Sequence, residues 1–292
     1  MSEMSPEDDR AVRNAIFAAR QAVEGGAQHG ARGVQVPVPM QEIEIPSAQV
    51  PLPSRGLVYP VDSPLHGKES VDIKGMTTQE EDILMSRALI KKGTVINELI
   101  RACLLTPGVA VNDMLAGDRN ALMVAIRITG YGPEYTPVVQ CPSCEQKTEY
   151  PIDLSNLDIK PLELEPVSPG QNRFSFLLPV SKKNVVFRFL TGKDEEEIAN
   201  IIETKKKKGL AVDSVITTRL ISCIVSINGN EDRGAIAKQI TYLPARDSLT
   251  LRKYMELHEP GIDMRCQFEC PNCGHTEEVA VPMGPSFFWP NS

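Results

Sequence analysis

Two Cys-x-x-Cys pairs constrain the fold of this 292-residue chain more than any other feature. The first pair is Cys141 and Cys144, the second is Cys270 and Cys273, and the 125 residues 145–269 lie between them. A Cys-x-x-Cys turn presents two sulfurs to one side of a metal ion, and two such turns complete the tetrahedral shell that zinc prefers. The sequence therefore predicts one structural zinc site, and a chain that leaves this site and later returns to it.

The residues around both pairs favour a zinc ribbon, in which each pair lies in a turn between two strands. The expected strands cover residues 136–140, 147–152, 264–268 and 277–281. Gly274 permits the left-handed backbone with which such a turn curls round a metal. Four thiolates leave no open position for water, which disfavours a catalytic zinc. Neither pair opens a helix after a strand, as a reactive thioredoxin-type thiol does.

The other cysteines and the histidines offer little further chemistry. Cys103 and Cys223 fall on apolar helical faces, where we expect core residues. Cys266 or His275 remains an alternative for one of the four metal ligands. The chain has no H-E-x-x-H, Walker or G-x-G-x-x-G motif, so we expect no catalytic residue and no residue that binds an organic cofactor.

Charge and hydropathy argue against two classes of partner. The formal net charge of −7 disfavours an electrostatic grip on nucleic acid or on an anionic membrane. No apolar run reaches the roughly 20 residues that span a bilayer. The acidic first ten residues lack the plan of a secretory signal. We therefore expect neither nucleic acid nor membrane as a partner, and a chain that is made in the cytoplasm.

The pattern along the chain predicts an α+β fold with helical and β-hairpin segments. In the first half, helices are expected over 6–23, from 76 onward, over 94–105 and over 117–129. In the second half, a β-hairpin over 174–179 and 184–190 precedes helices over 194–207, 212–225, 235–243 and 245–259. A Pro-spaced run over 34–60 favours an extended segment that lies along another surface.

These segments suggest five parts. They are an N-terminal helix with an extended Pro-rich arm (1–60), a helical module (61–134), a discontinuous zinc ribbon made of two β knuckles (135–155 with 262–284), an αβ insert (156–261) and an aromatic tail (285–292). The tail holds Phe287, Phe288 and Trp289. Three adjacent aromatic side chains are costly to expose, so they either fold back over the ribbon or anchor a partner.

Five motifs follow one another before the first cysteine pair. They are Leu52-Pro-Ser-Arg-Gly-Leu-Val-Tyr-Pro, Met76-Thr-Thr-Gln-Glu-Glu-Asp-Ile-Leu, Lys92-Gly-Thr-Val-Ile, Leu115-Ala-Gly-Asp-Arg and Ile126-Arg-Ile-Thr-Gly-Tyr-Gly-Pro-Glu-Tyr. In order and spacing, over residues 52–281, they resemble the baseplate hub protein family of T-even-type contractile-tailed bacteriophages. The resemblance does not cover the helix and arm before residue 52.

The resemblance implies a non-enzymatic structural protein that acts in assembly of the baseplate hub and lies in the virion tail. Its partners would be other baseplate, hub and tail proteins in a symmetric assembly, contacted through the N-terminal arm and the aromatic tail. A zinc-ribbon protein that binds nucleic acid or regulates transcription is the main rival, but the flanks of both knuckles are mostly acidic. A third reading, a metal-dependent hydrolase or thiol oxidoreductase, would need an open metal position or a reactive thiol.

Overall fold

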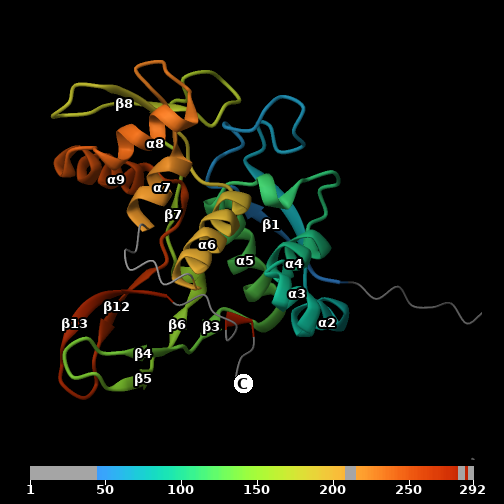
Figure 1. Cartoon of the computed structure of the whole chain (residues 1–292). Coiled ribbons are helices and arrows are strands. Elements are labelled where there is room, and N and C mark those ends of the chain that lie inside the picture. The colour runs from blue at the N-terminus through green and yellow to red at the C-terminus, as the bar shows by residue number, and fades with distance from the viewer. Residues whose placement is uncertain (1–44, 208–214, 282–286, 289–292) are drawn as a thin grey trace, which may run out of the picture. The chain divides into compact units, whose positions relative to one another are not determined.

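The computed structural model describes residues 45–207, 215–281 and 287–288 (Figure 1). All of them belong to one unit of the chain, Glu44–Ser292. Helices and small antiparallel sheets alternate along it, which confirms the α+β class. The helix expected over 6–23 lies outside the described residues, as does most of the extended arm.

A two-stranded antiparallel sheet opens the described chain. β1 (Ser47–Pro51) pairs with β2 (Ser70–Lys74). Alternate side chains of a strand point to opposite faces, and here Val50, Val71 and Ile73 are the buried ones. Both strands pack against the long helix α5 (Ala116–Tyr131). The end of the expected arm is therefore a strand within the chain's own core.

Four helices lie in the region where three were expected. They are α2 (Thr78–Met85), α3 (Arg87–Lys92), α4 (Val95–Cys103) and α5, with a short 3-10 turn η1 (Val111–Asp113) before α5. α2 begins directly after Thr77, which forms a reciprocal capping box with Glu80. Ser86 has an extended backbone that separates α2 from α3, so the single helix expected there is wrong.

The segment between the cysteine pairs builds a three-stranded sheet in the order β10-β9-β8. Its hairpin, β8 (Phe174–Leu177) and β9 (Asn184–Phe187), confirms the prediction. The helices are α6 (Gly192–Lys207), α7 (Val215–Cys223), α8 (Arg233–Thr241) and α9 (Ala245–His258).

One boundary in this segment differs from the expectation. Residues 224 and 225 were expected at the end of a helix, but they start β10 (Ile224–Ile227), which pairs with β9. Ile224 and Ile227 of this strand are buried, and β-branched side chains favour the strand conformation. Tertiary packing therefore overrides the helical pattern here.

Two short strand pairs bring together the segments that flank the cysteine hairpins and the segment between them. β3 (Glu134–Tyr135) pairs with β6 (Ile152–Asp153), and β7 (Ile159–Lys160) pairs with β11 (Gly261–Ile262). A 3-10 turn, η2 (Leu154–Asn156), lies between β6 and β7. Gly117 allows this closure, because a Cβ at that position would lie 1.8 Å from the Pro260 carbonyl oxygen.

One hydrophobic cluster contains residues from all five expected parts. Its members include Val50, Leu99, Ile152, Phe174 and Phe287. The rings of Phe174 and Phe187 lie 5.7 Å apart within it. The division of the chain into five parts stays a prediction, but the described segments of all five parts share a core.

Candidate metal centre

Two β-hairpins hold the four cysteines. β4 (Val138–Gln140) and β5 (Lys147–Glu149) flank the first pair, and β12 (Arg265–Glu269) and β13 (Thr276–Ala280) flank the second. These strands follow the predicted positions, except that β3, β4, β5 and β6 are four short strands where two longer ones were expected. Figure 1 shows the two hairpins side by side, although all the elements from β7 to β11 lie between them in the sequence.

The cysteine sulfurs gather in one place, as the sequence predicts. The Sγ atoms of Cys141 and Cys273 are 3.7 Å apart, and so are those of Cys144 and Cys270. All four sulfurs lie within 4.8 Å of one another, and the group could hold a metal ion. With Zn–S bonds near 2.3 Å, the sulfurs of a ZnS₄ tetrahedron lie about 3.8 Å apart. The cysteine cluster therefore fits a tetrahedral zinc ion.

The two turns have matching backbone geometry. Glu145 N–H donates to the Cys141 carbonyl and Gly274 N–H to the Cys270 carbonyl, each over 2.9 Å. Both Glu145 and Gly274 have left-handed backbones, with φ of 59° and 67°. Glycine adopts this conformation freely, whereas a glutamate does so at some cost in free energy. The second turn is thus the less strained of two similar knuckles.

A small apolar cluster packs against the buried cysteines. Val139 and Phe268 are buried together with Cys141 and Cys270. Tyr150 joins the hairpins, because its ring meets Phe268 edge-on at 5.2 Å and its hydroxyl donates to the Gln267 carbonyl over 2.8 Å. The hairpins are therefore in contact through side chains as well as through the sulfurs.

The electrostatics of the cluster suit a bound cation. The N–H of Gln146 and the amide of Asn272 lower the pKa of Cys144 to about 6. The N–H of His275 would lower the pKa of Cys273 too, but the neighbouring sulfurs raise it to about 12. Like charges this close resist joint ionisation, and a divalent cation removes that resistance because it binds thiolates.

The alternative ligands do not join the cluster. Cys266 lies within β12 opposite Val279, and His275 has a partly exposed ring whose Nε2 is 3.4 Å from the Glu277 carboxylate. Among the described residues, the four cysteines are the only group of three or more potential ligands close enough to share a metal. Cys103 and Cys223 are buried, which confirms the prediction that they are core residues.

The charged side chains beside the knuckles are exposed and mostly acidic. They are Glu145, Lys147, Glu149, Glu269, Glu277 and Glu278. The phosphates of a nucleic acid would be repelled by these acidic side chains. Affinity for nucleic acid comes largely from basic side chains that neutralise phosphates. The charges at the cysteine cluster therefore disfavour the nucleic-acid reading.

The C-terminal phenylalanines fold back on the chain. Phe287 and Phe288 are 0% and 2% exposed, and Phe287 meets Tyr135 edge-on at 5.2 Å. Arg127 donates through Nε to the Phe287 carbonyl over 2.7 Å. The expectation that these two rings contact a partner is wrong, because the chain's own core covers them. Trp289 lies outside the described residues.

Two buried ionisable residues of α5, Asp118 and Arg127, make polar contacts inside the core that were not predicted from the sequence. Asp118 accepts hydrogen bonds from the N–H and hydroxyl of Ser54 and from the Tyr59 hydroxyl, at 2.6–2.9 Å. Arg127 donates to the carbonyls of residues 287, 132 and 134. Burial raises the pKa of Asp118, against the effect of its hydrogen bonds, and lowers the pKa of Arg127.

A signal for them exists in the sequence. Both residues lie in α5, among the apolar positions that mark its buried face. An ionisable side chain on such a face needs hydrogen-bond partners when buried, so it predicts a polar contact inside the core. Ser54, Tyr59, Asp118 and Arg127 all belong to the motifs that carry the family resemblance. Those motifs therefore serve the internal structure of the chain.

Comparison with known proteins identifies the family. The family described as T4 bacteriophage base plate protein matches residues 58–289. No curated protein and no solved structure matches the chain. Within the residues that the structure describes, none of the helices has the length and apolar character needed to cross a membrane. The match spans most of the 292 residues and confirms the resemblance of the motifs, so the chain belongs to the T4 bacteriophage base plate protein family.

Proposed function

We propose that this chain is a structural component of the hub of a phage tail baseplate, and that one zinc ion bound by Cys141, Cys144, Cys270 and Cys273 stabilises its fold. The family match carries the first half of the proposal, because it supports a structural role in a baseplate, contacts with other tail proteins and a place in the virion tail. The hub itself and assembly in the host cytoplasm are finer inferences, which rest on the resemblance of the motifs.

The zinc would act mechanically. More than a hundred residues separate the two hairpins in the sequence, and the paired strands β7 and β11 lie at the two ends of that segment. The contact between the hairpins is therefore a long-range one. Four coordinate bonds at the cysteine cluster would hold them at a fixed distance, and closing a long loop removes much entropy from the unfolded chain. A rigid subunit suits an assembly that must keep its geometry.

The proposal includes no catalysis. A tetrahedral site with four thiolate ligands has no position for a substrate or a water nucleophile. The sulfur distances support such a closed site, and structural zinc sites are of this kind. Contacts with neighbouring subunits would involve residues 1–44 and the end of the tail around Trp289, within the five-part organisation inferred from the sequence.

The test of the function is the composition of purified phage tails. We expect peptides of this chain in isolated tails and in purified baseplate intermediates, detected by mass spectrometry at a ratio to other baseplate proteins that stays fixed across preparations. A chain that is absent from tails and also from assembling baseplates would overturn the structural role.

A further inference from the structure

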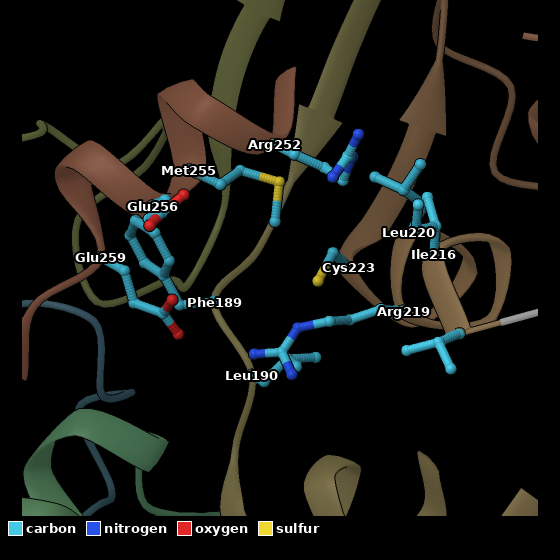
Figure 2. Close-up of a pocket in the computed structure, with 11 residues that line it drawn as sticks. Phe189, Leu190, Ile216, Arg219, Leu220, Cys223, Arg252, Met255, Glu256 and Glu259 are labelled. Atoms are coloured by element: carbon cyan, nitrogen blue, oxygen red, sulfur yellow. The ribbon is translucent and has the colours of Figure 1, made fainter. Parts of the chain in front are cut away.

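A hollow of about 280 Å³ lies between α7 and α9, apart from the cysteine cluster (Figure 2). Its wall is mainly apolar, with Phe189, Leu190, Leu220 and Met255 among the lining residues. Hollows with apolar walls and a few polar groups are the usual form of a binding pocket. The residues of this pocket have no part in the proposed zinc site.

Oppositely charged side chains face each other across this hollow. Figure 2 shows Arg219 reaching in from α7, opposite Glu259, which follows the last turn of α9. Within the described residues, no hydrogen bond or ion pair joins either side chain to another group. The Nε of Arg252, also at the wall, is buried without a hydrogen-bond partner. Desolvation raises the pKa of Glu259.

A second hollow of about 530 Å³ adjoins the first. Arg219, Glu256 and Glu259 line both hollows, and we call the two together the groove. The second part is the more polar one, because more charged residues line it, Lys160 and Asp263 among them. An occupant that fills both parts must be extended, with an apolar group at one end and polar groups at the other.

We propose that this groove binds an extended segment of another baseplate protein, which inserts an apolar side chain between α7 and α9. The inference rests on the proposed structural function. A peptide offers carbonyl oxygens that can accept hydrogen bonds from Arg219 and Arg252, and N–H groups that can donate to Glu259. These backbone groups lie next to every side chain of the peptide, including the apolar one that would be inserted. A purely apolar ligand would leave these charges unsatisfied, and nucleic acid would bring phosphates against Glu256 and Glu259.

The first test places a photo-reactive amino acid, p-benzoylphenylalanine, at Leu257, which lines the polar part of the groove and is 68% exposed. The matched control carries it at Tyr242, an aromatic position that is 79% exposed and lines neither part of the groove. Both full-length chains are incorporated into phage tails and irradiated, and the cross-linked residues are identified by mass spectrometry.

We expect the probe at 257 to cross-link to one segment of one other baseplate protein, and the probe at 242 not to reach that segment. Equal cross-linking at both positions, or none at 257, would overturn the proposal. A cross-link to a second copy of this chain, or to residues 208–214 of the same chain, would also overturn it, because the occupant would then be a different one.

The second test changes the mouth of the apolar part. Ile216→Asp places a carboxylate where the apolar side chain would enter, and Leu249→Asp is its control at a position of similar exposure on α9 (49% and 45%). We expect recovery of the Ile216→Asp chain in tails to fall about tenfold, and that of the control to stay near wild type. Thermal unfolding should be alike for both variants, because both side chains are half exposed.

Recovery of Ile216→Asp at the wild-type level would contradict the groove, while the structural function would stand. Absence of the wild-type chain from tails would instead contradict the proposed function. If Ile216→Asp fails to fold, the cross-linking result at 257 still decides the question, because that probe lies on an exposed side chain.

Discussion

At the residue scale, buried polar side chains tie together segments that are distant in the sequence. Asp118 holds the loop around Ser54 and Tyr59 against α5, and Arg127 holds the C-terminal phenylalanines near β3. Each of these ionisable groups has several hydrogen-bond partners, which offset the cost of its burial. Loss of one partner should therefore lower stability more than loss of an exposed polar group of the same kind.

Tyr59→Phe tests this at Asp118. The Tyr59 hydroxyl donates to Asp118 over 2.6 Å and accepts from the Leu115 N–H over 3.0 Å. Its removal leaves both groups short of a partner inside the core, so we expect a loss of about 2 kcal/mol in the free energy of unfolding. Chemical denaturation measures the loss. Tyr242→Phe, at an exposed tyrosine, is the control and should change it by less than about 0.5 kcal/mol. Equal effects of the two substitutions would contradict the role of Asp118.

The two knuckles allow a matched test of backbone strain. Gly274→Ala adds a Cβ at φ 67°, where no atom lies within 4 Å, so only the backbone conformation is affected. We expect a loss of about 1 kcal/mol. Glu145 has a φ of 59° in the other knuckle and already carries a Cβ, so Glu145→Ala should be nearly neutral. Thermal unfolding of the two variants compares them, and a neutral Gly274→Ala would show that the left-handed turn is not fixed.

At the element scale, helix starts and helix junctions decide how well the sequence predicts the fold. Capping residues and apolar spacing located α2, α4, α5, α8 and α9 because those signals are local. They failed at Ser86, where an extended backbone breaks the helix, and at Ile224, where a strand begins that pairs with β9. The same limit holds for the five motifs, because the contacts that their residues make with distant segments appear only in the structure.

The capping box of α2 predicts a pH dependence. Burial alone would raise the pKa of Glu80, but hydrogen bonds from Lys74 and Thr77 outweigh it and hold the pKa below its ordinary value. A depressed pKa in the folded state gives stability that is complete above the unfolded value, roughly 4.3, and is lost as the pH falls through the folded value. Denaturation of wild type and Glu80→Gln should thus differ most near neutral pH.

That difference should shrink as the pH is lowered below the unfolded value. Asp82→Asn, at an exposed carboxylate on the same helix, is the control and should differ from wild type by little at any pH. A gap between wild type and Glu80→Gln that stays constant down to acid pH would show that the carboxylate contributes through packing rather than through its charge.

The junction between α5 and β11 predicts a steric effect. Gly117→Ala would place a Cβ 1.8 Å from the Pro260 carbonyl oxygen, so the backbone of one segment must move. We expect a loss of about 3 kcal/mol or more. Gly234→Ala is the matched control, because it also lies in the first turn of a helix and its Cβ would meet only Asp232, at 3.5 Å. It should be neutral or stabilising, as alanine favours helices.

At the scale of the whole molecule, the sequence predicted the gathering of the four cysteines but not the groove between α7 and α9. Cysteine spacing is a strong signal because few structures use it, and the metal chemistry demands that the pairs meet. The groove joins residues of several elements whose order carries no motif. The C-terminal phenylalanines show the same limit, since their composition fitted both a partner contact and burial, and only the structure places them in the core.

The zinc content of the full-length chain tests the central claim most directly. Native mass spectrometry of protein purified without chelators should give the mass of one chain plus one zinc ion. Cys141→Ser should lose that zinc and unfold at a lower temperature, while Cys266→Ser should keep it. A wild-type chain of metal-free mass, together with unchanged thermal stability of Cys141→Ser, would contradict the account.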